Sequence, residues 1–216
     1  MRLTTNKWDP RAAWLFVVIF IAAQLLIQFL IIPILKDVLR KFFFAHTIYF
    51  ALIGFFLLFI TFKFLESEKL SEFLSAVGLA RQRPDRWTAR SLTIGLFLGV
   101  VSVYSVDPHY FSEPNNWFRG FYATSLPILF DPLVEEPILR GYLYRAFRTK
   151  YSIPEAMVAI LIVAFISHWQ NVTASLGNFF FIMVLQTIFC ILREHTNTLF
   201  PVLFCHLAYN SVIAFN

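Results

Sequence analysis

The chain alternates between long apolar runs and short polar segments along nearly its whole length. The apolar runs are continuous rather than alternating in hydrophobicity, which is typical of membrane-spanning helices and not of β-barrel strands. They cover residues 12–35, 42–62, 91–106, 120–143, 153–169, 179–192 and 199–215. The pattern predicts an all-α fold: a polytopic transmembrane helical bundle of about seven spans, forming a single membrane domain over residues 1–216.

The segment from residue 63 to residue 90 has a different pattern. Charged residues are interleaved with Leu and Phe at a largely helical spacing, and Trp87 follows near the end of the segment. This is typical of an amphipathic helix that lies on the membrane surface, with residues 83–87 as its exit turn and Trp87 as an anchor at the interface. We expect one such interfacial helix in addition to the spans.

The composition supports a membrane protein. Hydrophobic residues make up 58% of the chain and charged residues only 14%, whereas about 25% of the residues in a soluble domain are charged. Most Lys and Arg residues lie before residue 12, in 63–90, in 145–150 and at Arg193, which predicts a multi-pass protein of the cell membrane with a cytoplasmic N-terminus. The net charge of +5 fits the lipid bilayer as a partner and does not indicate nucleic acid.

Ionisable side chains inside the apolar runs mark a candidate site, because such groups are costly at membrane depth. The fourth run holds the adjacent carboxylates Glu135 and Glu136, with Arg140 one helical turn after Glu136. Glu136 and Arg140 can therefore pair on one helix face, which leaves Glu135 about 100° away and able to face other groups. Because Pro137 removes a backbone donor beside the carboxylates, we expect a broken or kinked helix and a small polar cavity there.

Three further polar residues lie in other apolar runs. His168 is in the fifth run, and His206 and Asn210 are one turn apart in the seventh. At about 1.5 Å of rise per residue, these residues and Glu135 share mid-membrane depths, so we expect them to converge on one cavity open toward the cytoplasmic half. Such a set can activate water. The carboxylate acts as general base, one histidine orients the water or carries its proton, and the second histidine and Asn210 donate to the oxyanion.

Other interpretations of the same residues remain open. Glu136 and Arg140 can be a plain ion pair, and a histidine or Asn210 can simply join helices by a hydrogen bond. A zinc site is a rival, although no H-E-x-x-H motif is present and the ligands come from three helices. A proton-coupled transporter is another, because Glu and His can form a proton relay. A non-catalytic immunity or scaffold protein of the membrane is a third alternative.

Three short motifs occur in order in the second half of the chain. Residues 135–140 read Glu-Glu-Pro-Ile-Leu-Arg, residues 206–210 read His-Leu-Ala-Tyr-Asn, and His168 lies between them. They resemble the EExxxR, HxxxN and FxxxH motifs of the CAAX-protease and bacteriocin-processing (CPBP, also called Abi) intramembrane proteases. Ala164 stands where the third motif has Phe, a departure that concerns the substrate pocket. The resemblance covers about residues 120–216, the expected CPBP-like catalytic core.

The resemblance implies an integral-membrane endopeptidase of the glutamic type, in which Glu135 activates the water. The implied catalytic partners of Glu135 are His168, His206 and Asn210, and the implied supporting pair is Glu136 and Arg140. We expect no metal and no cofactor. The implied substrate is a membrane-associated protein or peptide: a prenylated CAAX protein, a bacteriocin or peptide precursor, or a protein with a C-terminal sorting signal.

Overall fold

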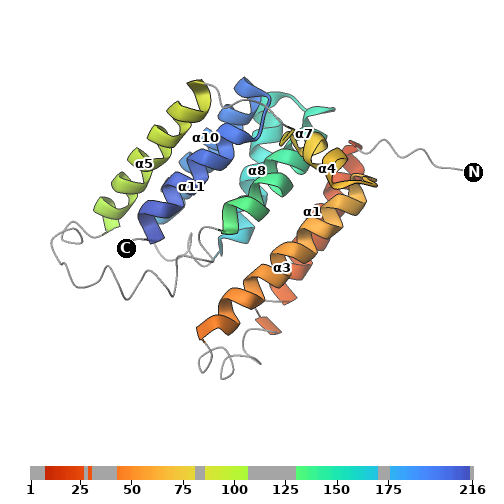
Figure 1. The fold of residues 1–216 in the computed structure, drawn as a ribbon, viewed down its shortest axis with the longest axis horizontal. Helices are drawn as coiled ribbons and strands as arrows, with labels where there is room; N and C mark the ends of the chain where they lie inside the picture. Colours follow the sequence, from red (N-terminus) through yellow and green to blue (C-terminus); the bar gives the residue numbers. More distant parts are fainter. Residues whose placement is uncertain are drawn as a thin grey trace, which may run out of the picture.

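The computed structural model of the chain describes residues 8–26, 29–30, 43–80, 86–106, 130–169 and 176–214. Every regular element in these ranges is a helix, which confirms the all-α prediction (Figure 1). The helices are α1 (Pro10–Leu26), α3 (Phe43–Phe64), α4 (Leu70–Val77), α5 (Arg86–Val106), the π-helix η3 (Pro137–Leu143), α7 (Tyr144–Arg148), α8 (Ile153–Ser167), α10 (Leu176–Thr196) and α11 (Phe200–Ala214). Residues 130–136, ahead of η3, are also α-helical.

The described helices coincide with the predicted apolar runs. Residues 27–28 and 31–35 of the first run, 42 of the second, 120–129 of the fourth and 215 of the seventh lie outside the described residues. α10 is long and apolar enough to cross a membrane. α8 and α11 have 15 residues each, whereas a helix needs about 20 residues to span the hydrocarbon core. The count of seven spans therefore remains a prediction.

The predicted interfacial helix over 63–90 is divided in the structure. α3 extends into its first residues, and α4 forms a separate helix of eight residues. Phe73 and Val77 are buried on the inner side of α4, while Leu70 is exposed. Gly78 ends α4 with a φ of 90°, a backbone conformation that glycine adopts without strain. α5 begins before the predicted third span, and residues 81–85 lie outside the described part of the chain.

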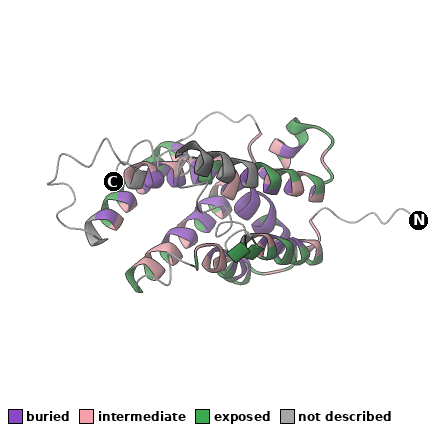
Figure 2. Cartoon of the chain, turned by 90° about the horizontal axis from the view of Figure 1, so that it is seen from below, coloured by how far each residue is buried: buried purple, intermediate pink, exposed green. Residues whose placement is uncertain are grey.

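The helix that carries the two carboxylates lies inside the helix group. All seven residues of η3 are buried, and Figure 2 shows buried residues gathered toward the middle of the molecule, with exposed residues around the outside. The ring of Tyr142 in η3 packs against Phe16 of α1 and Phe64 of α3, with centroids 5.3 and 6.2 Å apart. The first helices of the chain therefore enclose one side of η3.

Two glycines allow α5 and α11 to pack closely. Gly95 and Gly99 are spaced as in a GxxxG motif, which lets helix backbones approach each other in membrane proteins. A Cβ on Gly95 would overlap the backbone carbonyl of Cys205, and a Cβ on Gly99 would lie 2.7 Å from that of Val212. This packing fixes the position of α11, which carries two of the predicted site residues.

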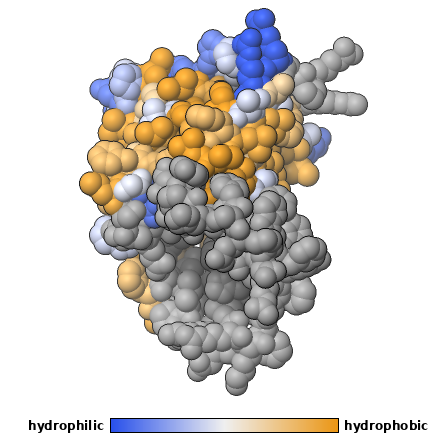
Figure 3. All heavy atoms as spheres, turned by 90° about the vertical axis from the view of Figure 1, so that its left-hand side faces the viewer, coloured by the Kyte–Doolittle hydropathy of each residue, from blue (hydrophilic) through white to orange (hydrophobic). Residues whose placement is uncertain are grey.

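The outside of the helix group carries many large apolar side chains. Exposed examples are Leu15 and Val18 on α1, Phe55 and Phe59 on α3, and Phe97 on α5. Figure 3 shows hydrophobic residues over the middle of one face and hydrophilic residues gathered at its upper end. An apolar surface of this extent is typical of a protein that contacts lipid.

Candidate active site

The two adjacent carboxylates lie where an α-helix changes into a π-helix. Residues 130–136 are α-helical, and η3 begins at Pro137. Proline has no N–H to donate, and a π-helical turn changes the hydrogen-bond register without ending the helix. The irregularity expected at Pro137 is therefore a π-helical segment rather than a break. Glu136 is fully buried, and the side chain of Glu135 is 16% exposed.

Glu136 and Arg140 form an ion pair one helical turn apart. The Nη1 atom of Arg140 lies 3.3 Å from Oε1 of Glu136, and both side chains are fully buried. The Nη2 atom of Arg140 donates to the side-chain oxygen of Gln186 on α10 and, at 3.2 Å, to the backbone carbonyl of the same residue. The guanidinium also lies 5.2 Å from the ring centroid of Phe189. Arg140 therefore connects the carboxylate helix to α10.

His206 on α11 contacts the same carboxylate. Its Nδ1 lies 2.7 Å from Oε1 of Glu136, and the residue is buried. Because a carboxylate accepts, Nδ1 carries the hydrogen and donates it. The sequence predicted that His206 faces Glu135, whereas its hydrogen bond goes to Glu136. Glu135 is nevertheless near, since ligand atoms of Glu135, Glu136 and His206 all lie within 4.8 Å of one another.

His168 follows the end of α8 and lies near the other carboxylate. Its Nε2 is 3.8 Å from Oε1 of Glu135, too far for a direct hydrogen bond but close enough for one water molecule to contact both atoms. Its Nδ1 lies 3.0 Å from the backbone carbonyl of Ala164, so Nδ1 donates and Nε2 can accept in the neutral ring. The hydrogen bond is made to the backbone carbonyl of Ala164. The side chain at this position, Ala here and Phe in the FxxxH motif, therefore does not affect it.

The capping of α8 sets where His168 lies. Ser152 precedes the helix, and Oε2 of Glu155 accepts hydrogen bonds from the backbone N–H and the hydroxyl of Ser152, at 2.8 and 2.7 Å. Such a capping box defines the first turn of a helix. At the other end, the backbone N–H of His168 donates to the carbonyl of Ala164 at 2.9 Å. Both ends of α8 are thus defined by local hydrogen bonds.

The structure brings together most of the residues selected from the sequence. Both carboxylates and the two histidines are linked by the distances above, and Arg140 supports Glu136. Asn210 lies one helical turn after His206 on α11 and is buried. Residues from three separate apolar runs therefore meet around Glu135 and Glu136.

Two polar residues near the site were not selected from the sequence. Gln186 is buried and binds Arg140; the signal for it is a polar side chain within the sixth apolar run. Asp131 lies one helical turn before Glu135 and is exposed, and its carboxylate interacts electrostatically with Glu135 and both histidines. The signal for Asp131 is its spacing of four residues from Glu135.

One oxygen of each carboxylate has no hydrogen-bond partner among the described residues. Oε2 of Glu135 and Oε2 of Glu136 are buried and accept no hydrogen bond from the residues that the structure describes. Buried acceptors without partners are costly, so we expect water, substrate or a cation to contact them. Glu135, Glu136 and His206 include ligand types that bind metals. Binding through Oε1 of Glu136 or Nδ1 of His206 would require their present hydrogen bonds to break.

Comparison with known protein families identifies this half of the chain. Residues 116–212 match the family described as type II CAAX prenyl endopeptidase Rce1-like. This stretch is similar to that family. The matched range contains both carboxylates, both histidines and Asn210, and it confirms the resemblance drawn from the three motifs. None of the curated proteins and none of the solved structures matches the chain.

The match to the Rce1-like family also indicates a membrane protein and a peptidase. Rce1-like proteins are membrane proteins, which agrees with the apolar surface and with the candidate span α10. The family description indicates a peptidase, and therefore a hydrolase, of the CAAX protease type.

Proposed function

We propose that this chain is an intramembrane endopeptidase of the CAAX prenyl protease type, in which Glu135 activates a water molecule that hydrolyses a peptide bond. The observation that carries the proposal is the 3.8 Å separation of Oε1 of Glu135 from Nε2 of His168. One water can contact both atoms at that separation. In support, neither oxygen of Glu135 accepts a hydrogen bond from a described residue, whereas Oε1 of Glu136 is held by both Arg140 and His206.

In the proposed reaction, Glu135 takes a proton from the water as the water oxygen attacks the carbonyl carbon of the scissile bond. His168 orients the water by accepting its second hydrogen at Nε2. The carbonyl oxygen becomes an oxyanion in a tetrahedral intermediate. The C–N bond then breaks, and the proton taken by Glu135 passes to the departing amine. The products are a carboxylic acid and an amine, and the free carboxylate of Glu135 is regenerated.

His206 and Asn210 are the proposed donors to the oxyanion. His206 already donates Nδ1–H to Glu136, so it needs a second hydrogen at Nε2, as an imidazolium, to donate elsewhere. The negative charge of Glu136 favours that cation. A donor aimed at a developing oxyanion contributes roughly 10²–10³-fold in kcat. Glu136 and Arg140 are positioning residues in this scheme.

The proposed setting is a bundle of about seven spans in the cell membrane, with a cytoplasmic N-terminus. The exposed Phe and Leu side chains would let a membrane-associated protein or peptide approach from the lipid. A prenylated CAAX protein, a peptide precursor and a protein with a C-terminal sorting signal are the candidate substrates.

A cleavage assay in proteoliposomes tests the function. The purified protein is reconstituted and given three fluorogenic peptides: a farnesylated CAAX peptide, the same peptide without the farnesyl group, and an unrelated apolar peptide. We expect cleavage of at least one membrane-bound peptide, with loss of activity in His168→Ala and retention in Glu68→Gln, an exposed control. No cleavage of any peptide by a folded protein would support a non-catalytic role, and equal cleavage by His168→Ala would contradict the proposed role of His168.

A metal-dependent peptidase is the second candidate, favoured by the three ligand atoms within 4.8 Å of one another. It predicts that 1,10-phenanthroline abolishes cleavage and that added Zn²⁺ restores it. The water mechanism of Glu135 predicts that neither treatment changes the rate.

A further inference from the structure

A group of three arginines lines a cavity at one end of α10. Arg145 and Arg148 come from α7, and Arg193 comes from the last turn of α10. The cavity has a volume of about 290 Å³, and the residues that line it are Tyr144, Arg145, Arg148, Arg193, Glu194 and Asn197. It contains one carboxylate for three guanidinium groups, so it carries an excess of positive charge.

The carboxylate in the cavity is already occupied. Arg148 binds Glu194 through two hydrogen bonds of 3.1 Å, Nε to Oε2 and Nη2 to Oε1. These hydrogen bonds to Glu194 raise the pKa of Arg148 further above its ordinary value, so Arg148 stays charged. Oε2 of Glu194 also accepts from the hydroxyl of Tyr144, at 3.0 Å. Arg145 and Arg193 therefore remain without a carboxylate in this cavity.

Arg193 is a buried cation that forms no ion pair with any described residue. It is 4% exposed, its Nε donates to the backbone carbonyl of Arg140 at 3.3 Å, and its buried Nη1 has no partner in the described structure. Its guanidinium lies beside Gly78, where a Cβ would be 2.8 Å from Nη1. A buried guanidinium is costly unless an anion compensates it. Glu194 acts on Arg193 electrostatically but forms no ion pair with it in the described structure, so the free Nη1 of Arg193 can still bind an anion.

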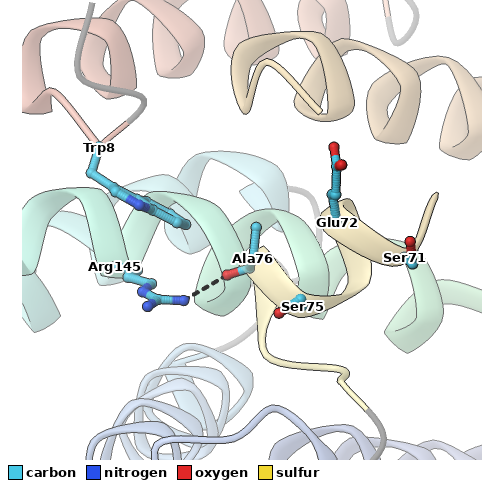
Figure 4. A pocket seen from close by; sticks show the side chains of 6 residues that line it. All are labelled: Trp8, Ser71, Glu72, Ser75, Ala76 and Arg145. Atoms are coloured by element: carbon cyan, nitrogen blue, oxygen red, sulfur yellow. Dashed lines mark hydrogen bonds between the residues drawn. The ribbon is translucent and has the colours of Figure 1, made fainter. Parts of the chain in front are cut away.

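Arg145 is exposed, but its side chain is held in place. Its Nη1 donates to the carbonyl of Ala76 at 2.7 Å, and its guanidinium lies 4.6 Å from the ring centroid of Trp8. Figure 4 shows Arg145 pointing to that carbonyl, with Trp8 beside it, at the edge of a second cavity of about 470 Å³. That second cavity is lined by one cation, Arg145, and one carboxylate, Glu72, so the excess positive charge lies in the cavity with Arg193.

The depth of the arginine cavity indicates the kind of anion. Arg193 lies in the last turn of α10, the helix long and apolar enough to cross a membrane. Aromatic side chains that favour the interface lie at the same end: the ring of Trp87 packs 4.5 Å from His195, and Nε1 of Trp14 donates to the hydroxyl of Tyr151 at 3.3 Å. Phospholipid phosphates lie at this level of a bilayer, and basic pockets between helices bind them.

We propose that the cavity lined by Arg145, Arg148 and Arg193 binds a phosphate group, supplied by an anionic phospholipid headgroup. The planar guanidinium fork matches phosphate oxygens in charge and geometry. A phosphate between Arg145 and Arg193 would join α7 to α10. α7 continues from η3, which holds Arg140, and α10 holds Gln186, which binds Arg140. An occupied cavity would therefore stabilise the helices that position Glu135 and Glu136.

Thermal unfolding of the delipidated protein in detergent tests this site. The probes are dioctanoyl-phosphatidylglycerol, dioctanoyl-phosphatidylcholine and inorganic phosphate, each added to wild type and to variants. We expect phosphatidylglycerol to raise the unfolding midpoint of wild type by several degrees and phosphatidylcholine to leave it unchanged. Arg145→Gln and Arg193→Gln should each lose at least half of that rise. Arg86→Gln, an exposed arginine outside the cavity, should keep it.

The outcomes separate the possible sources of the phosphate. An equal rise with inorganic phosphate, lost in the same variants, would support the anion site and overturn the lipid source. If Arg193→Gln fails to fold, Arg145→Gln decides, because Arg145 is exposed. The proposal is overturned if no probe shifts the midpoint, or if Arg145→Gln responds to phosphatidylglycerol as fully as wild type does.

Discussion

Glu136 accepts two hydrogen bonds at a single oxygen, one from Arg140 and one from His206. Glu136→Gln would remove the negative charge from a fully buried cluster and leave the guanidinium of Arg140 without its anionic partner. Removing one partner of a buried ion pair typically costs about 3–5 kcal/mol. We therefore expect a clear fall in the unfolding midpoint in detergent. Glu68→Gln, at an exposed position, is the control. An unchanged midpoint for Glu136→Gln would contradict the ion-pair interpretation.

Gln186 accepts a hydrogen bond from Nη2 of Arg140, whose Nη1 binds Glu136. We therefore expect the side chain of Gln186 to position Glu136 through Arg140. Gln186→Leu removes one acceptor of Arg140 and keeps the backbone carbonyl that also binds it. A lost buried hydrogen bond to a charged group costs about 1.5–3 kcal/mol. We predict a lower unfolding midpoint and a lower kcat with little change in KM. Thr187→Val, at the neighbouring half-buried position, should alter neither, and an equal loss in Thr187→Val would point to a general effect on α10.

The sequence was sufficient to select the charged residues, because Glu135, Glu136 and Arg140 are conspicuous in an apolar run. It also predicted that histidines from two other runs come near them. It could not show which carboxylate each histidine contacts, since that depends on the rotation of α8 and α11 about their own axes. Gln186 was missed for a related reason: a neutral amide is a weak signal until its partner is known.

The close packing of α5 on α11 depends on Gly95. A methyl group there would overlap the backbone carbonyl of Cys205, so Gly95→Ala must push α11 away from α5. Overpacking of this kind typically costs about 1–3 kcal/mol. Because α11 carries His206 and Asn210, we also expect cleavage to fall. Gly177→Ala, at an exposed glycine at the start of α10, should keep both stability and activity. Wild-type behaviour of Gly95→Ala would show that the two helices separate at little cost.

At Pro137, the sequence predicted that the helix is irregular but not which form the irregularity takes. The missing N–H predicted an irregular helix, which the structure has. The form of the irregularity, a π-helix that continues into α7, depends on packing around η3, where Tyr142 contacts rings of α1 and α3. Likewise, the apolar spacing after residue 63 predicted one amphipathic helix up to an exit turn at residues 83–87, but Gly78 ends α4 earlier.

For the whole protein, the basic residues predict which side of the membrane each loop occupies. In a chain with Cys190→Ala and Cys205→Ala, Asn115→Cys should react with a membrane-impermeant maleimide in intact cells. Lys150→Cys should react only after permeabilisation. Labelling of both positions in intact cells would mean that no span separates them, and the reverse pattern would invert the predicted orientation.

The helical class and the approximate helix positions followed from the apolar runs alone. The number of helices that cross the membrane did not, because described helices such as α8 and α11 are shorter than a bilayer core. The arginine cavity was also beyond the sequence, since Arg145 and Arg193 lie far apart in the chain and meet only through the packing of α7 on α10.

The role of Glu135 as the base that activates water is tested most directly by Glu135→Gln, which keeps the shape of the side chain and removes its ability to take a proton. Cleavage of a membrane-bound peptide is measured in proteoliposomes for wild type, Glu135→Gln and Glu68→Gln, with the unfolding midpoint of each. We predict that Glu135→Gln unfolds at a midpoint close to that of wild type and loses cleavage by a factor of at least about 10³, while Glu68→Gln keeps full activity. A well-folded Glu135→Gln protein that cleaves at the wild-type rate would contradict the mechanism.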